Sequence, residues 1–129
     1  MSGKDNTPGP GGSASRDGDA AEELAARFLA ARGMGILQRN FRCRGGEVDL
    51  VCRDGRTIVF VEVRLRRNAS YGGAGASITT AKQRRIVLAA EHYLALHGGG
   101  DCDCRFDCIL LDGLSTAAIE WIPDAFAAP

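Results

Sequence analysis

Apolar residues recur at helical spacing in two segments of the chain. In the first, Leu24, Phe28 and Ala31 lie three or four positions apart, and Gly33 follows where such a helix would stop. The second segment covers residues 80–96, and its apolar positions form one helical face: Ile86, Ala89, Ala90, Tyr93 and Leu94. The pattern therefore predicts two helices, separated by a long stretch of a different character.

Short apolar runs, alternating or continuous, predict strands in the rest of the chain. Asp54-Gly55 is a strong two-residue hairpin signal between two of these runs. Five strands are expected, at residues 36–43, 47–52, 57–65, 105–112 and 117–122, followed by a terminal segment. The order is helix, three strands, helix and two strands.

Charged side chains occupy one face of two neighbouring predicted strands. Glu47 and Asp49 share a face of the strand before the hairpin, and Glu62, Arg64 and Arg66 share a face of the strand after it. Carboxylates rarely lie in strongly apolar strands without a partner. The hairpin brings Asp49 and Glu62 toward each other, although the sequence does not fix the register of the two strands.

Two interpretations of these acids remain open at this point. Carboxylates a few ångströms apart repel each other unless a cation or a proton lies between them. Carboxylate and carbonyl oxygens suit Mg²⁺ or Mn²⁺, so Asp49, Glu62 and the backbone carbonyl of Val63 are candidate metal ligands. In the other interpretation, the acids lie exposed at a solvated sheet edge or form salt bridges with nearby arginines.

Charge is distributed unevenly along a chain that is neutral as a whole. The 129 residues are 45% hydrophobic and 25% charged, with a formal net charge of zero, so global charge gives no sign of a nucleic-acid partner. Between Glu62 and Glu91, however, there is no acid, and this stretch contains Arg64, Arg66, Arg67, Lys82, Arg84 and Arg85. Acids beside such a basic segment suit a phosphodiester substrate. Arginines are also common on solvated helices that bind nothing specific, so the segment fits both interpretations.

Residues 1–17 are rich in Gly, Ser, Pro and Asp, which predicts a disordered N-terminal tail ahead of a single domain at residues 18–129. Asp17 or Asp19 is expected to cap the first helix. The start of the chain has no hydrophobic segment typical of a secretory signal, and no apolar run approaches the roughly 18 residues that span a bilayer. A cytoplasmic protein without a membrane partner is expected.

Five cysteines are present, and an odd number without a signal segment favours reduced thiols over a disulfide framework. Cys102, Cys104 and Cys108 have a C-x-C-x3-C spacing, which lacks the C-x2-C knuckle and the paired histidines of a zinc site. Cys108 lies in an apolar run and is expected to pack as a small hydrophobic residue. Packing is therefore the preferred interpretation of these thiols.

Several short motifs resemble those of the YraN-like family, also called the UPF0102 family. They are ExxAxxxL from residue 22, ILxxNxR from 36, GEVDL from 46, FVEVR from 60, KxxRI from 82, RFD from 105 and DAF from 124. The resemblance covers about residues 20–126. It implies a restriction-endonuclease-like core, an α/β fold whose mixed β-sheet is flanked by helices, and the predicted order of elements agrees with that core.

The resemblance also implies a nuclease motif of the form D-x(n)-E-x-K. Asp49 would be its aspartate and Glu62 its glutamate, with Arg64 in the place of the lysine. Glu22 and Glu47 would be accessory acids, and Glu22 is the better candidate to approach the metal. The residues implied for the site are therefore acidic ligands for Mg²⁺ or Mn²⁺ beside one arginine.

Arg64 departs from the motif in a way that affects the chemistry. Arginine has a pKa above about 12 and stays protonated, so Arg64 cannot act as a general base. Its guanidinium can still hold a phosphate bidentately and stabilise charge that develops on it. Lys82, at the start of the second helix, is a second basic residue that could take the place of the lysine in space.

Three classes of function follow from these residues. The leading hypothesis is a metal-dependent endonuclease-like protein acting on DNA, including branched or damaged DNA, with Tyr71 available to stack on a base. The first rival is a catalytically inactive module of nuclease fold that binds nucleic acid. The second is a structural or adaptor protein whose acids and arginines only pair with each other. Resolvase-like proteins act as symmetric dimers, so a homodimer is expected by analogy.

Overall fold

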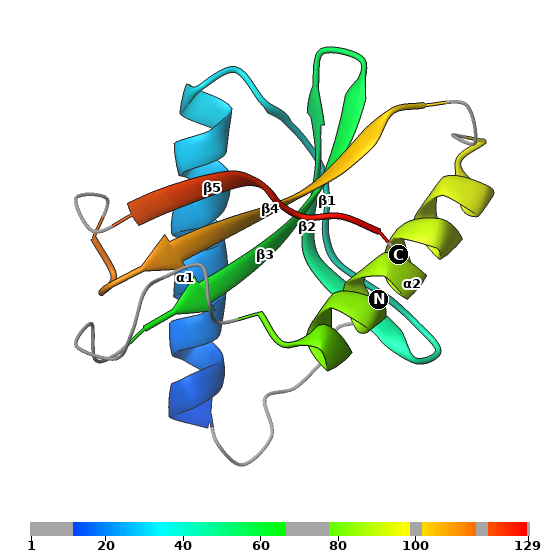
Figure 1. The fold of residues 1–129 in the computed structure, drawn as a ribbon. Helices are drawn as coiled ribbons and strands as arrows, with labels where there is room; N and C mark the ends of the chain where they lie inside the picture. Colours follow the sequence, from blue (N-terminus) through cyan, green and yellow to red (C-terminus); the bar gives the residue numbers. More distant parts are fainter. Residues whose placement is uncertain (1–11, 67–77, 99–101, 116–118, 129) are drawn as a thin grey trace, which may run out of the picture.

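The computed structural model describes residues 12–66, 78–98, 102–115 and 119–128, with the side chains from residue 18 onward. Its elements follow in the order α1 (Gly12–Ala31), β1 (Gly35–Cys43), β2 (Gly46–Asp54), β3 (Thr57–Leu65), α2 (Thr80–Leu96), β4 (Cys104–Leu111) and β5 (Ile119–Phe126). This α-β-β-β-α-β-β order and the α/β class confirm the prediction (Figure 1).

The five strands form one sheet in the order β1-β2-β3-β4-β5. The first three make an antiparallel meander, and the predicted hairpin pairs Asp54 with Thr57 around Gly55, whose φ of 63° suits glycine. Strand β4 pairs with β3 in parallel, and β5 returns antiparallel to β4. A parallel pair needs a long crossover, and α2 lies within it. The sheet is therefore mixed, as predicted.

The two helices cover opposite faces of the sheet (Figure 1). Helix α1 packs through Ala25 and Leu29 against alternate strand residues, including Val59 and Val61. Helix α2 packs against the other alternate set, which contains Phe60, Ile58 and Phe106. This alternation places Val61 toward α1 and Glu62 toward α2, so the side of β3 that carries Glu62 faces α2.

Helix α1 begins earlier than the cap residues predicted from the sequence. Its helical backbone starts at Gly12 and continues through Asp17 and Asp19, so neither aspartate is the cap. An N-cap residue needs a non-helical backbone, which neither position has here. The predicted tail at residues 1–17 therefore overlaps the start of α1, and its first eleven residues lie outside the described part of the chain. No described helix is long and apolar enough to cross a membrane.

Strand β5 extends further than predicted, through Pro123 and Asp124 to Phe126. Proline donates no hydrogen bond, which is tolerated here because β5 lies at an edge of the sheet. Asp124 has a positive φ of 54°, and the pairing with β4 shifts register between Phe106 and Cys108. The terminal segment thus joins the sheet through a bulge, a feature that hydrophobic alternation does not reveal.

Candidate functional site

The candidate site forms where β2 and β3 stop pairing with each other. Their last paired residues are Leu50 and Val61, although both strands continue beyond this point. Asp49 of β2 and Glu62 of β3 are the next residues beyond this last pair. The backbone N–H of Val63 donates a hydrogen bond to Asp49 Oδ2 at 2.8 Å. The strand register, which the sequence could not fix, therefore places the two predicted acids side by side. Here the Asp49 carboxylate, and not a backbone carbonyl of β2, accepts the hydrogen bond from β3.

Glu22 of α1 joins these two acids from the other helix layer. The pKa of Glu22 is raised to about 7 by burial and by the charge of Asp49, while a hydrogen bond from Asn40 opposes the shift. Asp49 shares side-chain hydrogen bonds with both Glu22 and Glu62. The structure thus brings together the three acids that the sequence proposed as metal ligands, with Asp49 in the centre.

Glu62 is the most buried of the three acids, with 5% of its surface exposed. Its Oε1 atom is buried and has no hydrogen-bond partner among the described residues. Burial and the neighbouring charge of Asp49 raise the pKa of Glu62 to about 8, despite the opposing charges of Lys82 and Arg64. A buried carboxylate oxygen without a donor is costly unless the group is protonated or a cation lies against it.

These acids suit a divalent cation in their chemistry, since all are oxygen ligands and their mutual repulsion needs a positive charge. Their present arrangement is that of hydrogen-bonded carboxyl pairs around Asp49. Within the described residues, no three His, Cys, Asp or Glu side chains are placed to hold a metal ion as they stand. Coordination would therefore require the Glu22 and Glu62 carboxyls to turn from Asp49 toward a shared ion. Val63 offers its N–H to Asp49, and its carbonyl remains a predicted ligand.

Glu47 lies with the basic residues of α2. Lys82 Nζ is 3.0 Å from Glu47 Oε2 and 3.7 Å from Glu62 Oε2, and Arg85 approaches Glu47 Oε1 at 3.9 Å. The hydrogen bond from Lys82 lowers the pKa of Glu47 below its usual value. Burial alone would lower the pKa of Lys82, but Glu47 and Glu62 raise it overall, so this lysine stays protonated. The contacts of Glu47 are those of an ion-pair partner.

A pocket of about 440 Å³ opens beside this cluster. Its walls combine one acid, two bases, a threonine and two apolar residues: Glu62, Arg64, Lys82, Thr79, Val63 and Leu65. Thr79 was not predicted. It is the N-cap of α2, and its side chain accepts from the backbone N–H of Lys82, a role that a threonine directly before a helix could have indicated. The pocket therefore brings Glu62, Arg64 and Lys82 to one place.

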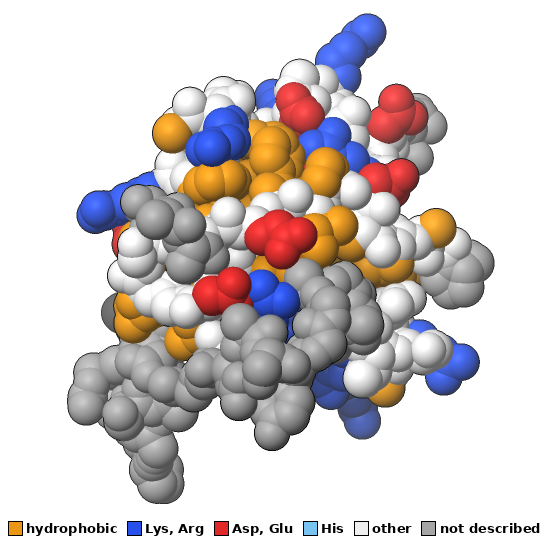
Figure 2. Space-filling model, turned by 60° about the vertical axis from the view of Figure 1, so that its left-hand side comes forward, with side chains coloured by type: hydrophobic (Ala, Val, Ile, Leu, Met, Phe, Trp, Pro, Cys, Tyr) orange, Lys and Arg blue, Asp and Glu red, His pale blue; other side chains and the backbone are white. Residues whose placement is uncertain are grey.

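The other predicted nucleic-acid contacts are dispersed. Arg66 forms ion pairs with Asp112 at 2.8 Å and Glu120 at 3.9 Å, and it does not line the pocket. Arg84 and Arg85 are exposed on α2, while Arg67 and Tyr71 lie outside the described residues. On the face shown in Figure 2, the lysine and arginine side chains of the described residues are scattered among acidic and hydrophobic ones and form no continuous basic patch with one another.

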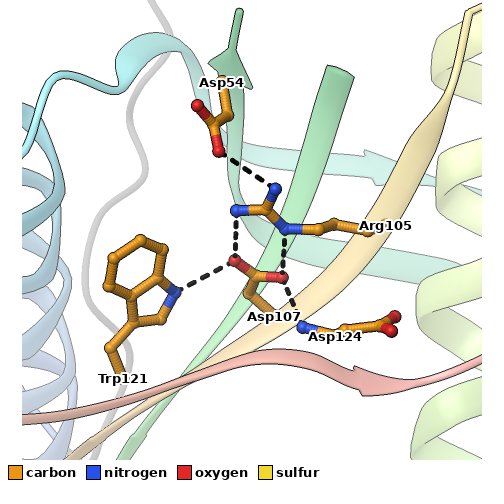
Figure 3. A network of polar contacts seen from close by, with 5 residues as sticks. All are labelled: Asp54, Arg105, Asp107, Trp121 and Asp124. Carbon is orange, nitrogen blue, oxygen red and sulfur yellow. Dashed lines mark hydrogen bonds and ion pairs between the residues drawn. The ribbon is translucent and has the colours of Figure 1, made fainter.

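A second buried acid, Asp107 of β4, lies in a different environment (Figure 3). Its carboxylate accepts from Arg105 Nε at 3.0 Å, from Trp121 Nε1 at 3.0 Å and from the backbone N–H of Asp124 at 2.9 Å. Arg105 also bonds to Asp54 at 3.0 Å. The pairing of Asp107 with Arg105 is therefore part of a network that fastens β5 to the sheet.

The thiols play no part in the candidate site. All five cysteines are free, and Cys108 is buried, as predicted. Burial and the charge of Glu62 raise the pKa of Cys108 to about 12, so its thiol stays protonated and unreactive. Cys102 and Cys104 are exposed at the start of β4.

Comparison with known proteins gives one consistent result. The model of Uncharacterised protein family UPF0102 matches residues 21–111, which contain every acid of the candidate site. A UPF0102 protein of Dechloromonas aromatica is 60% identical over 86% of this chain and 88% of its own length. Those of Methylobacillus flagellatus and Ralstonia nicotianae are each 54% identical, over 86% and 92% of this chain and 96% and 92% of their own lengths. The chain therefore belongs to the UPF0102 family.

Proposed function

We propose that this protein is a divalent-metal-dependent nuclease-like protein that acts on DNA phosphodiesters. One observation carries the proposal: Glu22, Asp49 and Glu62 meet where β2 and β3 separate, and the buried Oε1 of Glu62 has no hydrogen-bond partner among the described residues. Acids gathered at such a point, with the pKa values of Glu22 and Glu62 raised, are better explained by a positively charged ligand than by packing.

Each acid has a distinct part in holding Mg²⁺ or Mn²⁺. Asp49 is fixed by the N–H of Val63, so it is the ligand whose position is already set. Glu62 contributes its unpartnered oxygen, Glu22 assists from α1, and the carbonyl of Val63 completes the proposed set. When bound, a divalent cation lowers the pKa of water and polarises the phosphate. The acids themselves must lose the protons that they share before they bind such an ion.

Arg64 and Lys82 would hold the substrate. Both line the pocket beside Glu62, and both carry a fixed positive charge that suits a phosphate. Arg84 and Arg85, exposed on the same helix as Lys82, would contact neighbouring phosphates of the DNA backbone. Neither Arg64 nor Lys82 is able to accept a proton from water at neutral pH.

That last point favours a second candidate function. With Arg64 in place of the motif lysine and Lys82 held protonated between two acids, the described part of the pocket offers no basic side chain that is neutral at pH 7. A protein of this kind would bind nucleic acid through the same pocket without cutting it. The two functions differ in cleavage and share salt-sensitive binding.

A cleavage screen with matched acid variants tests the proposal. Linear, single-stranded and branched DNA are incubated with Mg²⁺ or Mn²⁺ and the wild-type chain, Glu62→Gln or Glu22→Gln. Glu23→Gln is the control, because Glu23 follows Glu22 on α1 but pairs with Arg27 and Arg39 instead. Wild type and Glu23→Gln should cleave with Mg²⁺, Glu62→Gln should lose cleavage, and Glu22→Gln should be slowed.

The pattern of products separates the hypotheses. Equal cleavage by wild type and Glu62→Gln would contradict the proposal. Binding of DNA by wild type without cleavage of any substrate would support the inactive module instead. Paired symmetric cuts in a branched substrate would indicate that two copies act together, which is the assembly expected of resolvase-like proteins.

A further inference from the structure

Lys82 occupies an unusual place for a cation. It lies in the first turn of α2, where the positive end of the helix dipole disfavours positive side chains, and this turn contains no acid. Its backbone N–H is already satisfied by the hydroxyl of Thr79 at 3.1 Å. Helix formation therefore does not explain the lysine, and its reason must lie in what its ammonium group contacts.

The ammonium is held between two acids of β2 and β3. It lies 3.0 Å from Glu47 Oε2 and 3.7 Å from Glu62 Oε2, with 26% of the lysine side chain exposed. Packing of α2 on β2 at Gly46 fixes this position. A Cβ at Gly46 would meet the Arg85 carbonyl oxygen at 2.6 Å and the Ala89 nitrogen at 2.9 Å. The helix therefore approaches too closely for any larger residue, and the start of α2 has little freedom relative to Glu47.

The two contacts of Lys82 differ in length and in consequence. The shorter contact, with Glu47, is a hydrogen-bonded ion pair at the edge of the cluster. The longer contact, with Glu62, places a positive charge beside one of the acids proposed to hold the divalent cation, while the other oxygen of Glu62 has no partner among the described residues. Two cations close to one carboxylate repel each other, so the ammonium and a metal ion compete for Glu62.

We infer that Lys82 is an exchangeable internal counter-ion of the candidate metal site. Its ammonium lies against Glu62 in the metal-free protein, and a divalent cation bound by Glu62 displaces it into the pocket, where it contacts a substrate phosphate. Glu47 keeps the lysine attached to the site in both states. This inference rests on the proposed function, and it adds a form of regulation: metal binding and phosphate binding strengthen each other through one side chain.

Such coupling is reciprocal. If a cation at Glu62 makes Lys82 available to a phosphate, then a phosphate that engages Lys82 makes Glu62 available to the cation by the same factor. Glu62 and Lys82 line the same pocket, so the lysine can change partners without a movement of the helix. A side-chain rotation is sufficient.

Direct measurement of Mn²⁺ binding, by calorimetry or electron spin resonance, tests the inference without any reference to cleavage. Lys82→Met should bind Mn²⁺ about tenfold more tightly than wild type, because it removes a competing charge within a few ångströms of Glu62. Lys82→Arg should stay close to wild type. Arg84→Met is the matched control: it removes one charge from the same turn of α2, at an exposed position, and should leave Mn²⁺ affinity within about twofold.

The coupling is measured with a short fluorescent DNA duplex in the presence and absence of Ca²⁺. Wild type should bind this DNA more tightly with Ca²⁺, and Lys82→Met should lose most of that gain although it binds the metal more tightly. Arg84→Met should bind DNA more weakly under both conditions and keep the gain. A lysine with a merely structural role would not produce these opposite effects on metal and on DNA.

The outcomes separate this inference from the function on which it rests. Mn²⁺ binding that is lost in Glu62→Gln but is unchanged or weakened in Lys82→Met would overturn the counter-ion role and leave the proposed metal site intact. No Mn²⁺ binding by the wild-type chain would overturn both. Circular dichroism of each variant, compared with wild type, identifies any change that comes from unfolding.

Discussion

The sheet contains two buried acids, and they differ in how completely they are satisfied. Asp107 accepts hydrogen bonds from Arg105, Trp121 and the backbone of Asp124, so both of its oxygens have donors (Figure 3). Glu62 has one cation at 3.7 Å and one oxygen with no partner among the described residues. Burial alone therefore does not distinguish an acid that stabilises the fold from one that we propose binds a cation, whereas the hydrogen-bond donors around each acid do.

The difference has a physical cause in the surrounding elements. Asp107 lies where β5 bulges, and the bulge turns a backbone N–H and an indole toward it. Glu62 lies where β2 leaves β3, so the neighbouring strand offers the acid Asp49 in place of donors. An acid surrounded by donors is held in one place, whereas an acid facing another acid retains a proton or requires a cation.

The largest effect on stability is expected at Asp107. Asp107→Ala removes a fully buried carboxylate and leaves Arg105, the Trp121 indole and the Asp124 N–H without their acceptor, which should cost about 3–5 kcal/mol of unfolding free energy. Urea unfolding followed by circular dichroism measures this loss. Asp54→Ala is the control, because Asp54 is exposed and contacts the same arginine, and it should cost less than about 1 kcal/mol. Similar losses in both variants would show that burial of Asp107 contributes little.

Glu62 should show a smaller effect of the opposite sign. Its pKa is about 8 and that of Glu22 about 7 in the folded protein, against 4.5 when unperturbed. Between pH 4.5 and 8 the unfolded chain therefore releases protons that the folded chain keeps, and stability falls as pH rises. In metal-free buffer, the wild type should therefore unfold at a lower urea concentration at pH 8 than at pH 5.

Glu62→Gln sharpens this expectation, because glutamine has no proton to lose. The variant should be less sensitive to pH over this range, and it should be more stable than wild type at pH 8. Mg²⁺ should restore stability to the wild type at pH 8 and have little effect on Glu62→Gln. Glu91→Gln, at an exposed position of α2, is the control and should follow the wild type. Parallel pH curves for wild type and Glu62→Gln would contradict the raised pKa.

Most of the fold was predictable because its signals are local. Helical spacing identified α2 over the same residues, 80–96, that the structure assigns to it, and the Asp54-Gly55 turn identified the β2–β3 hairpin. The predictions were wrong where the surrounding structure overrode a local sequence rule. Asp17 and Asp19 resemble caps but lie inside a helix, and the bulge at Asp124 lets β5 pass a proline.

The candidate site was predictable in composition but not in arrangement. The resemblance to a nuclease motif named Glu22, Asp49 and Glu62, and the structure brings them together. No sequence pattern indicated that β2 and β3 would stop pairing one residue before the two acids, because strand register depends on the whole sheet. For the same reason, the contact between Lys82 and Glu47, which comes from two distant elements, was not predicted.

The smallest effect tests whether the Asp107 network acts bond by bond. Trp121→Phe removes the indole N–H donor at 3.0 Å but keeps a ring that can contact Phe28 edge to face, so it should cost about 1 kcal/mol, the value of one hydrogen bond. Trp121 is the only tryptophan, so unfolding must be followed by circular dichroism. Phe28→Leu, which alters the ring contact and leaves the hydrogen bond, is the control. A loss in Trp121→Phe as large as in Asp107→Ala would mean that the network fails as a unit. Asp107 would then depend on a single donor, and it would differ from Glu62 only in how many of its hydrogen bonds are made.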